Sequence, residues 1–259
     1  MQRYRPNKVK TAINFIRRIR NWPAAVGMKL RPSKGALRLL EFRDGLTLII
    51  RVGQRGDEAV MHEMLFAGGY RRALSYLSTL PEGVVLDLGA NFGLFSLLAA
   101  RANPKLRIHA YEPGPENMDM FRMNLLANPQ LKERITLISK GVAGRPGKGS
   151  WSFVPDNPGA SGFFSQGPHT VEVELVSFQQ ALEACGSESA FVKMDIEGSE
   201  FDIIRETPHA TWQRVSALAF EVHEDPRNLT SQQEFFARLQ EEGFQIDEED
   251  VISYFAHRK

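Results

Sequence analysis

The sequence predicts an α/β fold with a mostly parallel sheet, and two observations support this prediction. Strand-like runs at 84–88 and 106–111 are each followed by a helical pattern, at 94–102 and 115–127. Such alternation is typical of βαβ units, whose strands pair in parallel. The first of these strands also runs into a turn with two glycines, and open α/β sheets bind their ligands at such turns.

The remaining elements follow from local patterns. Asp44-Gly45 is a strong two-residue turn, so the flanking runs Leu37–Arg43 and Leu46–Arg51 predict a β-hairpin. An apolar helical pattern then continues until Pro81. This pattern predicts one continuous helix at 57–80. Farther along the chain we expect strands at 134–139, 191–195 and 215–222, helices at 199–206 and 231–242, and a terminal hairpin at 244–257. Ser199-Glu200-Phe201-Asp202 resembles a capping box for the first of these helices.

The stretch 144–170 is rich in glycine, proline, serine and asparagine and contains four aromatic residues, Trp151, Phe153, Phe163 and Phe164. We expect a strand and a mobile loop here, with the chain returning as a strand at 171–176. The aromatic side chains either contact substrate or pack beneath the loop, and the sequence leaves both interpretations open.

The charge distribution sets the first 40 residues apart. They hold eleven Lys and Arg and no Asp or Glu, which leaves 21 basic against 31 acidic residues in the rest of the chain. Val9, Ala12, Ile13, Ile16 and Ile19 recur on one face of a helix that Pro23 ends. Three interpretations of this helix stay open. It docks on the chain's own acidic part or on a second copy, or residues 1–35 bind an anionic membrane surface, or the helix belongs to a nucleic-acid-binding tail. We therefore expect a basic extension at 1–56, followed by the main domain at 57–259.

Composition excludes several classes of protein. The single cysteine, Cys185, excludes an intrachain disulfide and a cysteine-rich zinc site. No apolar run reaches the length of about 18 residues that a transmembrane helix needs, and no signal peptide is evident. The expectation is a cytoplasmic protein, or one peripheral to the inner face of a membrane.

The run Val84–Gly93 is the most informative stretch of the chain. It reads as a strand ending near Asp87, followed by Gly89 and Gly93 in a turn and then a helix. The third glycine of a dinucleotide-binding motif is missing, while Glu112 ends the next strand. An acidic residue beside the turn would repel a diphosphate, so Asp87 and Glu112 indicate a nucleoside-like ligand with free ribose hydroxyls.

Polar side chains also end two later strands. Asp195 and Glu197 follow one strand, and Glu221 and His223 end another. The carboxyl ends of parallel strands share one edge, so these groups could converge near the glycine turn. Together they suit general acid–base catalysis or a hard cation held by oxygen ligands. No metal site is firmly predicted; if one exists, Asp195, Glu197 and Glu221 are its ligands. Lys193 lies one strand period before Asp195 and could pair with it.

Five motifs occur in order and together resemble a known family. They are Asp87-Leu88-Gly89-Ala90-Asn91-Phe92-Gly93, Tyr111-Glu112-Pro113, Gly141-Val142-Ala143, Lys193-Met194-Asp195-Ile196-Glu197-Gly198-Ser199-Glu200 and Glu221-Val222-His223. Across residues 57–225 the chain resembles the FkbM family of class I, S-adenosylmethionine-dependent methyltransferases. The resemblance implies a doubly wound, Rossmann-like sheet of seven mostly parallel strands that ends in an antiparallel hairpin.

The resemblance also implies roles for residues. Asp87, Gly89, Ala90, Asn91 and Gly93 would line the methionine half of S-adenosylmethionine, Glu112 the ribose, Gly141 and Val142 the adenine, and Asp195 the region near the sulfonium. The usual chemistry of the family is O-methylation of a hydroxyl on a sugar, glycan or natural product. Asp195 or His223 would be the base, with Glu197 and Glu221 supporting it or holding a divalent cation.

Three rival functions stay open at this stage. A nicotinamide-dependent oxidoreductase is disfavoured by the missing third glycine. A nucleic-acid methyltransferase is motivated by the basic N-terminus. A non-catalytic protein tethered to an anionic membrane would keep the cofactor fold without turnover.

Overall fold

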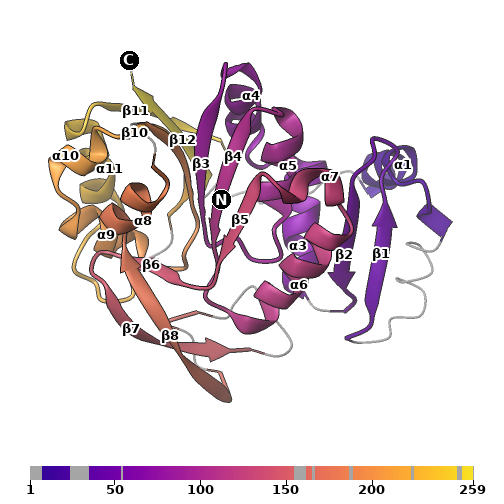
Figure 1. Cartoon of the computed structure of the whole chain (residues 1–259), viewed down its shortest axis with the longest axis horizontal. Coiled ribbons are helices and arrows are strands. Elements are labelled where there is room, and N and C mark those ends of the chain that lie inside the picture. The colour runs from indigo at the N-terminus through magenta and orange to yellow at the C-terminus, as the bar shows by residue number, and fades with distance from the viewer. Residues whose placement is uncertain are drawn as a thin grey trace.

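A seven-stranded sheet forms the centre of the molecule (Figure 1), a computed structural model that describes residues 8–23, 35–53, 55–154, 162–164, 167–186, 189–222, 225–249 and 253–258. The strand order is β11-β12-β10-β9-β3-β4-β5. All strands run parallel except β12, which pairs antiparallel with both of its neighbours. The predicted doubly wound, mostly parallel sheet with an antiparallel final hairpin is thereby confirmed. The strands are β3 (Gly83–Leu88), β4 (Leu106–Tyr111), β5 (Ile135–Ile138), β9 (Ala190–Met194), β10 (Val215–Glu221), β11 (Phe244–Glu248) and β12 (Ser253–Arg258).

Helices cover both faces of this sheet (Figure 1). Successive side chains of a strand point to opposite faces, so each central strand contributes to two cores. Val85 and Phe191 belong to one core, and Leu86 and Val192 belong to the other. The first core is closed by α4 (Arg71–Thr79), α5 (Leu94–Ala102), α6 (Pro115–Leu126) and α7 (Pro129–Lys132), and the second by α8 (Phe178–Ala184), α9 (Glu200–Glu206), α10 (His209–Trp212) and α11 (Gln232–Glu241).

A separate three-stranded sheet follows β5. Its order is β6-β8-β7, from β6 (Gly141–Ala143), β7 (Gly147–Phe153) and β8 (His169–Ser177). The strand β7 and the returning strand β8 confirm the predicted strand and return, and they pair antiparallel. The sequence did not predict β6 as a strand, because three residues beginning with glycine carry too little pattern.

The N-terminal extension packs on the rest of the chain. It comprises α1 (Lys8–Arg18) and the predicted hairpin, observed as β1 (Leu37–Glu41) paired antiparallel with β2 (Thr47–Arg51). Leu40, Leu48 and Ile50 are buried in the core shared with α4 and α5. Asn124 of α6 accepts a hydrogen bond from the Ile49 amide at 2.6 Å. The domain boundary at residue 56 stays a prediction. None of the described helices is long and apolar enough to cross a membrane.

Two local predictions are wrong. The single helix expected at 57–80 is broken into α3 (Arg55–His62), a π-helical turn η1 (Glu63–Ala67) and α4, because Gly68 and Tyr70 adopt positive φ angles of 91° and 59°. Ser199 makes no side-chain cap to α9. Instead, Glu200 folds back, and its carboxylate accepts hydrogen bonds from two amides of the turn after β9, those of Ile196 at 2.7 Å and Gly198 at 2.6 Å.

Candidate active site

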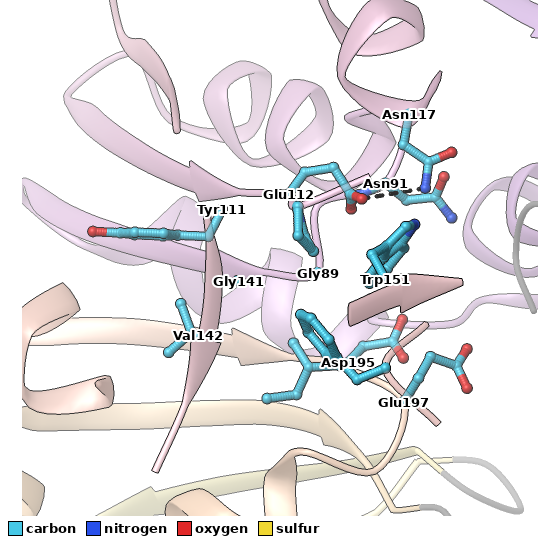
Figure 2. A pocket seen from close by; sticks show the side chains of 13 residues that line it. Gly89, Asn91, Tyr111, Glu112, Asn117, Gly141, Val142, Trp151, Asp195 and Glu197 are labelled. Atoms are coloured by element: carbon cyan, nitrogen blue, oxygen red, sulfur yellow. Dashed lines mark hydrogen bonds between the residues drawn. The ribbon is translucent and has the colours of Figure 1, made fainter. Parts of the chain in front are cut away.

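A pocket lies at the carboxyl edge of the central sheet, where the strand order reverses between β3 and β9 (Figure 2). Doubly wound sheets bind ligands at this switch point because the loops after neighbouring strands diverge there. Gly89 and Asn91 reach the pocket from the turn after β3, and Glu112 from the end of β4. Asp195 and Glu197 enter it from the turn after β9.

The turn after β3 requires glycine for reasons of packing. A Cβ added to Gly89 would lie 1.8 Å from the carbonyl oxygen of Asp195, so the turns after β3 and β9 touch through their backbones. A Cβ added to Gly93 would lie 2.2 Å from the ring of Phe121 on α6. Gly93 therefore permits close helix packing and does not line the pocket. Gly89 and Asn91, with φ of 78° and 52°, both line the pocket with left-handed backbone.

Glu112 organises one wall of the pocket. Its carboxylate accepts hydrogen bonds from the Asn91 amide at 2.8 Å, the Gly114 amide at 2.8 Å and the Asn117 side chain at 3.3 Å. Burial raises the pKa of Glu112 to about 7, although these three donors act in the opposite direction. A carboxylate offers about four lone-pair directions, so Glu112 retains capacity to accept a hydrogen bond from a ligand hydroxyl.

A buried lysine lies beneath the two turns. Lys193 is 2% exposed, and its ammonium donates to the carbonyl oxygens of Gly89 at 2.8 Å and Leu88 at 3.4 Å. The same nitrogen lies 3.4 Å from Asp195 Oδ2 and 3.6 Å from Asp87 Oδ1. Burial would lower the pKa of Lys193, but the carboxylates of Asp195 and Asp87 outweigh it and raise that pKa. Lys193 therefore stays charged and connects both turns, and its predicted pairing with Asp195 is confirmed.

Asp87 lies below the pocket and does not line it. It is fully buried, and its Oδ2 accepts a hydrogen bond from the Ser96 hydroxyl at 2.6 Å. Burial raises the pKa of Asp87, while Lys193 and Ser96 oppose that shift. Asp87 therefore supports the turn by holding Lys193 and Ser96.

Glu221 is also directed into the protein. The register that pairs Phe220 with Met194 places Glu221 beside Asp195 on neighbouring parallel strands. Its Oε1 accepts a hydrogen bond from the Tyr70 hydroxyl at 2.8 Å. Burial and the nearby charge of Asp195 raise the pKa of Glu221 to about 9. The raised pKa of Glu221 favours its neutral form at neutral pH.

Two residues that line the pocket each carry a buried polar atom with no hydrogen-bond partner among the described residues. These atoms are Oδ1 of Asn91 and the indole Nε1 of Trp151. Trp151 of β7 packs edge-on against Phe163, with ring centroids 5.2 Å apart. Figure 2 shows Trp151 between the side that carries Glu112 and the side that carries Asp195 and Glu197. Buried polar groups are normally paired, so these two atoms and Glu112 fit a ligand with hydroxyls and polar ring atoms, as a nucleoside has.

The structure brings together most, though not all, of the residues predicted from sequence. Gly89, Asn91, Glu112, Gly141, Val142, Asp195 and Glu197 line the pocket, whereas Asp87, Ala90, Gly93 and Glu221 do not. His223 lies outside the described residues. Sequence reasoning missed Asn117, which lies outside the five motifs, and it gave no role to Tyr111 of the Tyr111-Glu112-Pro113 motif. It also missed the supporting roles of Tyr70 and Glu200. It noted the loop aromatics, and Trp151 and Phe163 line the pocket.

No metal centre is evident. In the parts of the chain that the structure describes, no group of three or more His, Cys, Asp and Glu side chains is arranged to hold a metal ion. Two of the suggested ligands already have other partners, since Glu221 accepts a hydrogen bond from Tyr70 and Asp195 pairs with Lys193. The divalent cation considered from sequence has no support in this geometry.

The strand order, the antiparallel β12 and the pocket at the switch point define a class I methyltransferase fold, which implies S-adenosylmethionine as methyl donor. The Methyltransferase FkbM domain model matches residues 87–246, and the chain belongs to this family. Methyltransferase sdnD of Sordaria araneosa is 26% identical over 203 residues, which are 66% of this chain and 77% of that protein.

Two further relatives carry the family name. The 31-O-demethyl-FK506 methyltransferase FkbM of Streptomyces tacrolimicus is 26% identical over 176 residues, covering 56% of this chain and 66% of its own length. A crystal structure of methyltransferase FkbM from Methylobacillus flagellatus KT overlaps with a TM-score of 0.48 at 17% identity. That overlap covers 70% of this chain and 47% of the other.

Proposed function

We propose that this methyltransferase transfers the methyl group of S-adenosylmethionine to a hydroxyl oxygen, on a sugar, a glycan or a natural product, with Asp195 as general base. The supporting observation is the position of Asp195. Its side chain is 25% exposed in the pocket, and the Lys193 ammonium holds its carboxylate at 3.4 Å. An alcohol is a weak nucleophile, so a carboxylate fixed at the reacting edge supplies the basicity that it lacks.

The bound cofactor would supply an electrophilic methyl group attached to sulfur. Glu112, Asn91 and Trp151 would hold its nucleoside part, because they offer the buried polar atoms of the pocket. Asp195 would accept the hydroxyl proton of the acceptor as its oxygen takes the methyl group, and S-adenosylhomocysteine would be the other product. The protein's main contribution is to hold the two reactants in line.

Calorimetry is the first test of this proposal. The protein is titrated with S-adenosylmethionine and, separately, with NAD⁺. Binding of S-adenosylmethionine alone supports the proposal, and binding of NAD⁺ alone contradicts it. Failure to bind either would favour a non-catalytic protein that keeps the cofactor fold.

The base is tested next with Asp195→Asn, in an assay that measures S-adenosylhomocysteine formed with hydroxylated acceptors. We expect transfer to fall by about 10²–10⁴-fold while affinity for S-adenosylmethionine is retained. The control Asp119→Asn changes an exposed carboxylate that pairs with Arg122, and it should behave as wild type. Full activity of Asp195→Asn would refute the assignment of the base.

A further inference from the structure

The helix α1 docks on the protein with only one of its sides. Phe15 packs against Phe66 with ring centroids 5.6 Å apart, and Ile19, just beyond the helix, is fully buried. Ile13 and Ile16 are 44% and 39% exposed. The single apolar face expected from sequence is therefore divided: Ile19 joins the core, whereas Ile13 and Ile16 face outward.

The neighbouring strand β1 also exposes apolar side chains. Leu37 and Leu39 of β1 are each 44% exposed. Of the eight large apolar side chains exposed among the described residues, these two and the two isoleucines of α1 come from residues 13–39. Single exposed apolar side chains are ordinary, but a concentration of them in one segment marks an interaction surface.

The charge of the same segment identifies its partner. Residues 1–40 contain eleven basic and no acidic residues, and Arg17, next to Ile16, is exposed. A second copy would bring the same basic segment against itself, because a two-fold interface pairs identical surfaces. Nucleic acid would satisfy the charge but would leave four aliphatic side chains without an apolar environment.

We propose that α1 and β1 form a docking surface for an anionic lipid bilayer. Aliphatic side chains would enter the boundary between headgroups and acyl chains, while the basic residues would contact acidic headgroups. In Figure 1, α1 and the β1–β2 hairpin lie at one end of the molecule, away from the three-stranded sheet that walls the pocket. Lipid binding and cofactor binding can therefore be measured separately, and this proposal does not depend on the identity of the methyl acceptor.

The test is co-sedimentation of the full chain with vesicles of phosphatidylcholine, alone or mixed with phosphatidylserine. The variant carries Ile13→Glu and Ile16→Glu. Its matched control carries Leu126→Glu and Leu229→Glu, which add the same charge at two leucines that are 69% and 66% exposed outside the segment. Thermal melting and S-adenosylmethionine binding check that every variant is folded.

We expect wild type and control to bind the mixed vesicles alike, and the isoleucine variant to bind at least tenfold more weakly. Arg17→Gln should weaken binding by about fivefold, which corresponds to about 1 kcal/mol for each basic residue near the surface. Equal binding by the isoleucine variant and the control would overturn the proposal, as would equal binding to vesicles without phosphatidylserine. Displacement from vesicles by single-stranded RNA, with RNA affinity unchanged in the isoleucine variant, would identify nucleic acid as the partner instead.

Discussion

Replacing Lys193 by Met tests whether one buried cation supports both turns of the pocket. The substitution keeps an unbranched side chain that is one atom shorter, and it removes the ammonium that lies 2.8 Å from the Gly89 carbonyl oxygen and 3.6 Å from Asp87. Asp87 is fully buried and, among the described residues, would keep the Ser96 hydroxyl as its hydrogen-bond donor. Breaking a buried ion pair by removing one partner typically costs about 3–5 kcal/mol, and we expect a loss of this size at about pH 8.

The pH dependence of that loss is the specific part of the prediction. Burial already raises the pKa of Asp87 in the folded protein, and removal of Lys193 would raise it further. A carboxyl whose pKa is higher in the folded state destabilises that state as pH rises through the range between the two pKa values. The loss of unfolding free energy in Lys193→Met should therefore become smaller toward acidic pH, by up to about 1.4 kcal/mol for each pH unit in that range.

Urea unfolding at about pH 5 and about pH 8 measures the loss of unfolding free energy and its dependence on pH. The control is Lys140→Met, which breaks an ion pair with Glu174 whose side chains are 37% and 60% exposed. Exposed pairs contribute at most about 1 kcal/mol. The reasoning is refuted if both variants lose the same stability, or if the deficit of Lys193→Met does not change with pH.

Three further predictions concern the pocket and its support. The pKa of Glu112 is about 7 in the free protein, so binding of a ribose hydroxyl to its charged form should release protons near neutral pH. The heat of S-adenosylmethionine binding should then depend on the ionisation enthalpy of the buffer. Binding heats that are the same in all buffers would contradict this. Trp151→Phe should leave the melting temperature nearly unchanged but weaken S-adenosylmethionine binding by about 1 kcal/mol, and unaltered affinity would show that the indole N–H does not contact the cofactor. Tyr70→Phe removes the hydroxyl that donates to Glu221 and should lower the free energy of unfolding by about 1–3 kcal/mol. The control is Tyr76→Phe, at a tyrosine whose ring packs against Phe191 and Phe255. The control should change the free energy of unfolding less.

The sequence predicted the central elements accurately where the pattern was long and periodic. The helix at 94–102 and the strand at 106–111 have the observed bounds. The prediction failed where a few backbone angles override the pattern: Gly68 and Tyr70, with φ of 91° and 59°, interrupt a helical periodicity that continues through them in the sequence. Side-chain periodicity carries no information about a single left-handed residue, particularly a tyrosine, which rarely adopts that conformation.

The site was predicted in outline but not in the orientation of its side chains. Asp87 and Glu112 both lie at strand ends, and the sequence treated them alike as ligand-binding residues. In the structure Glu112 lines the pocket, whereas Asp87 points beneath the turn to Lys193 and Ser96. Asp195 likewise lines the pocket, whereas the neighbouring Glu221 does not and accepts a hydrogen bond from Tyr70. A strand-end position specifies an edge of the sheet but not the direction of the side chain.

The sequence by itself determined the strand-and-helix order, the family and the edge of the sheet that carries the chemistry, because these depend on local periodicity and on motifs contiguous in the chain. Only the tertiary structure decided which polar groups face the pocket. It also decided that Tyr70, which lies outside the family match, donates a hydrogen bond to Glu221. It further decided that α1 docks through Phe15 and leaves Ile13 and Ile16 exposed. Those outcomes depend on contacts between residues distant in the chain. The free energy of each contact is set by burial and by its neighbours, and neither is encoded in any single stretch of sequence.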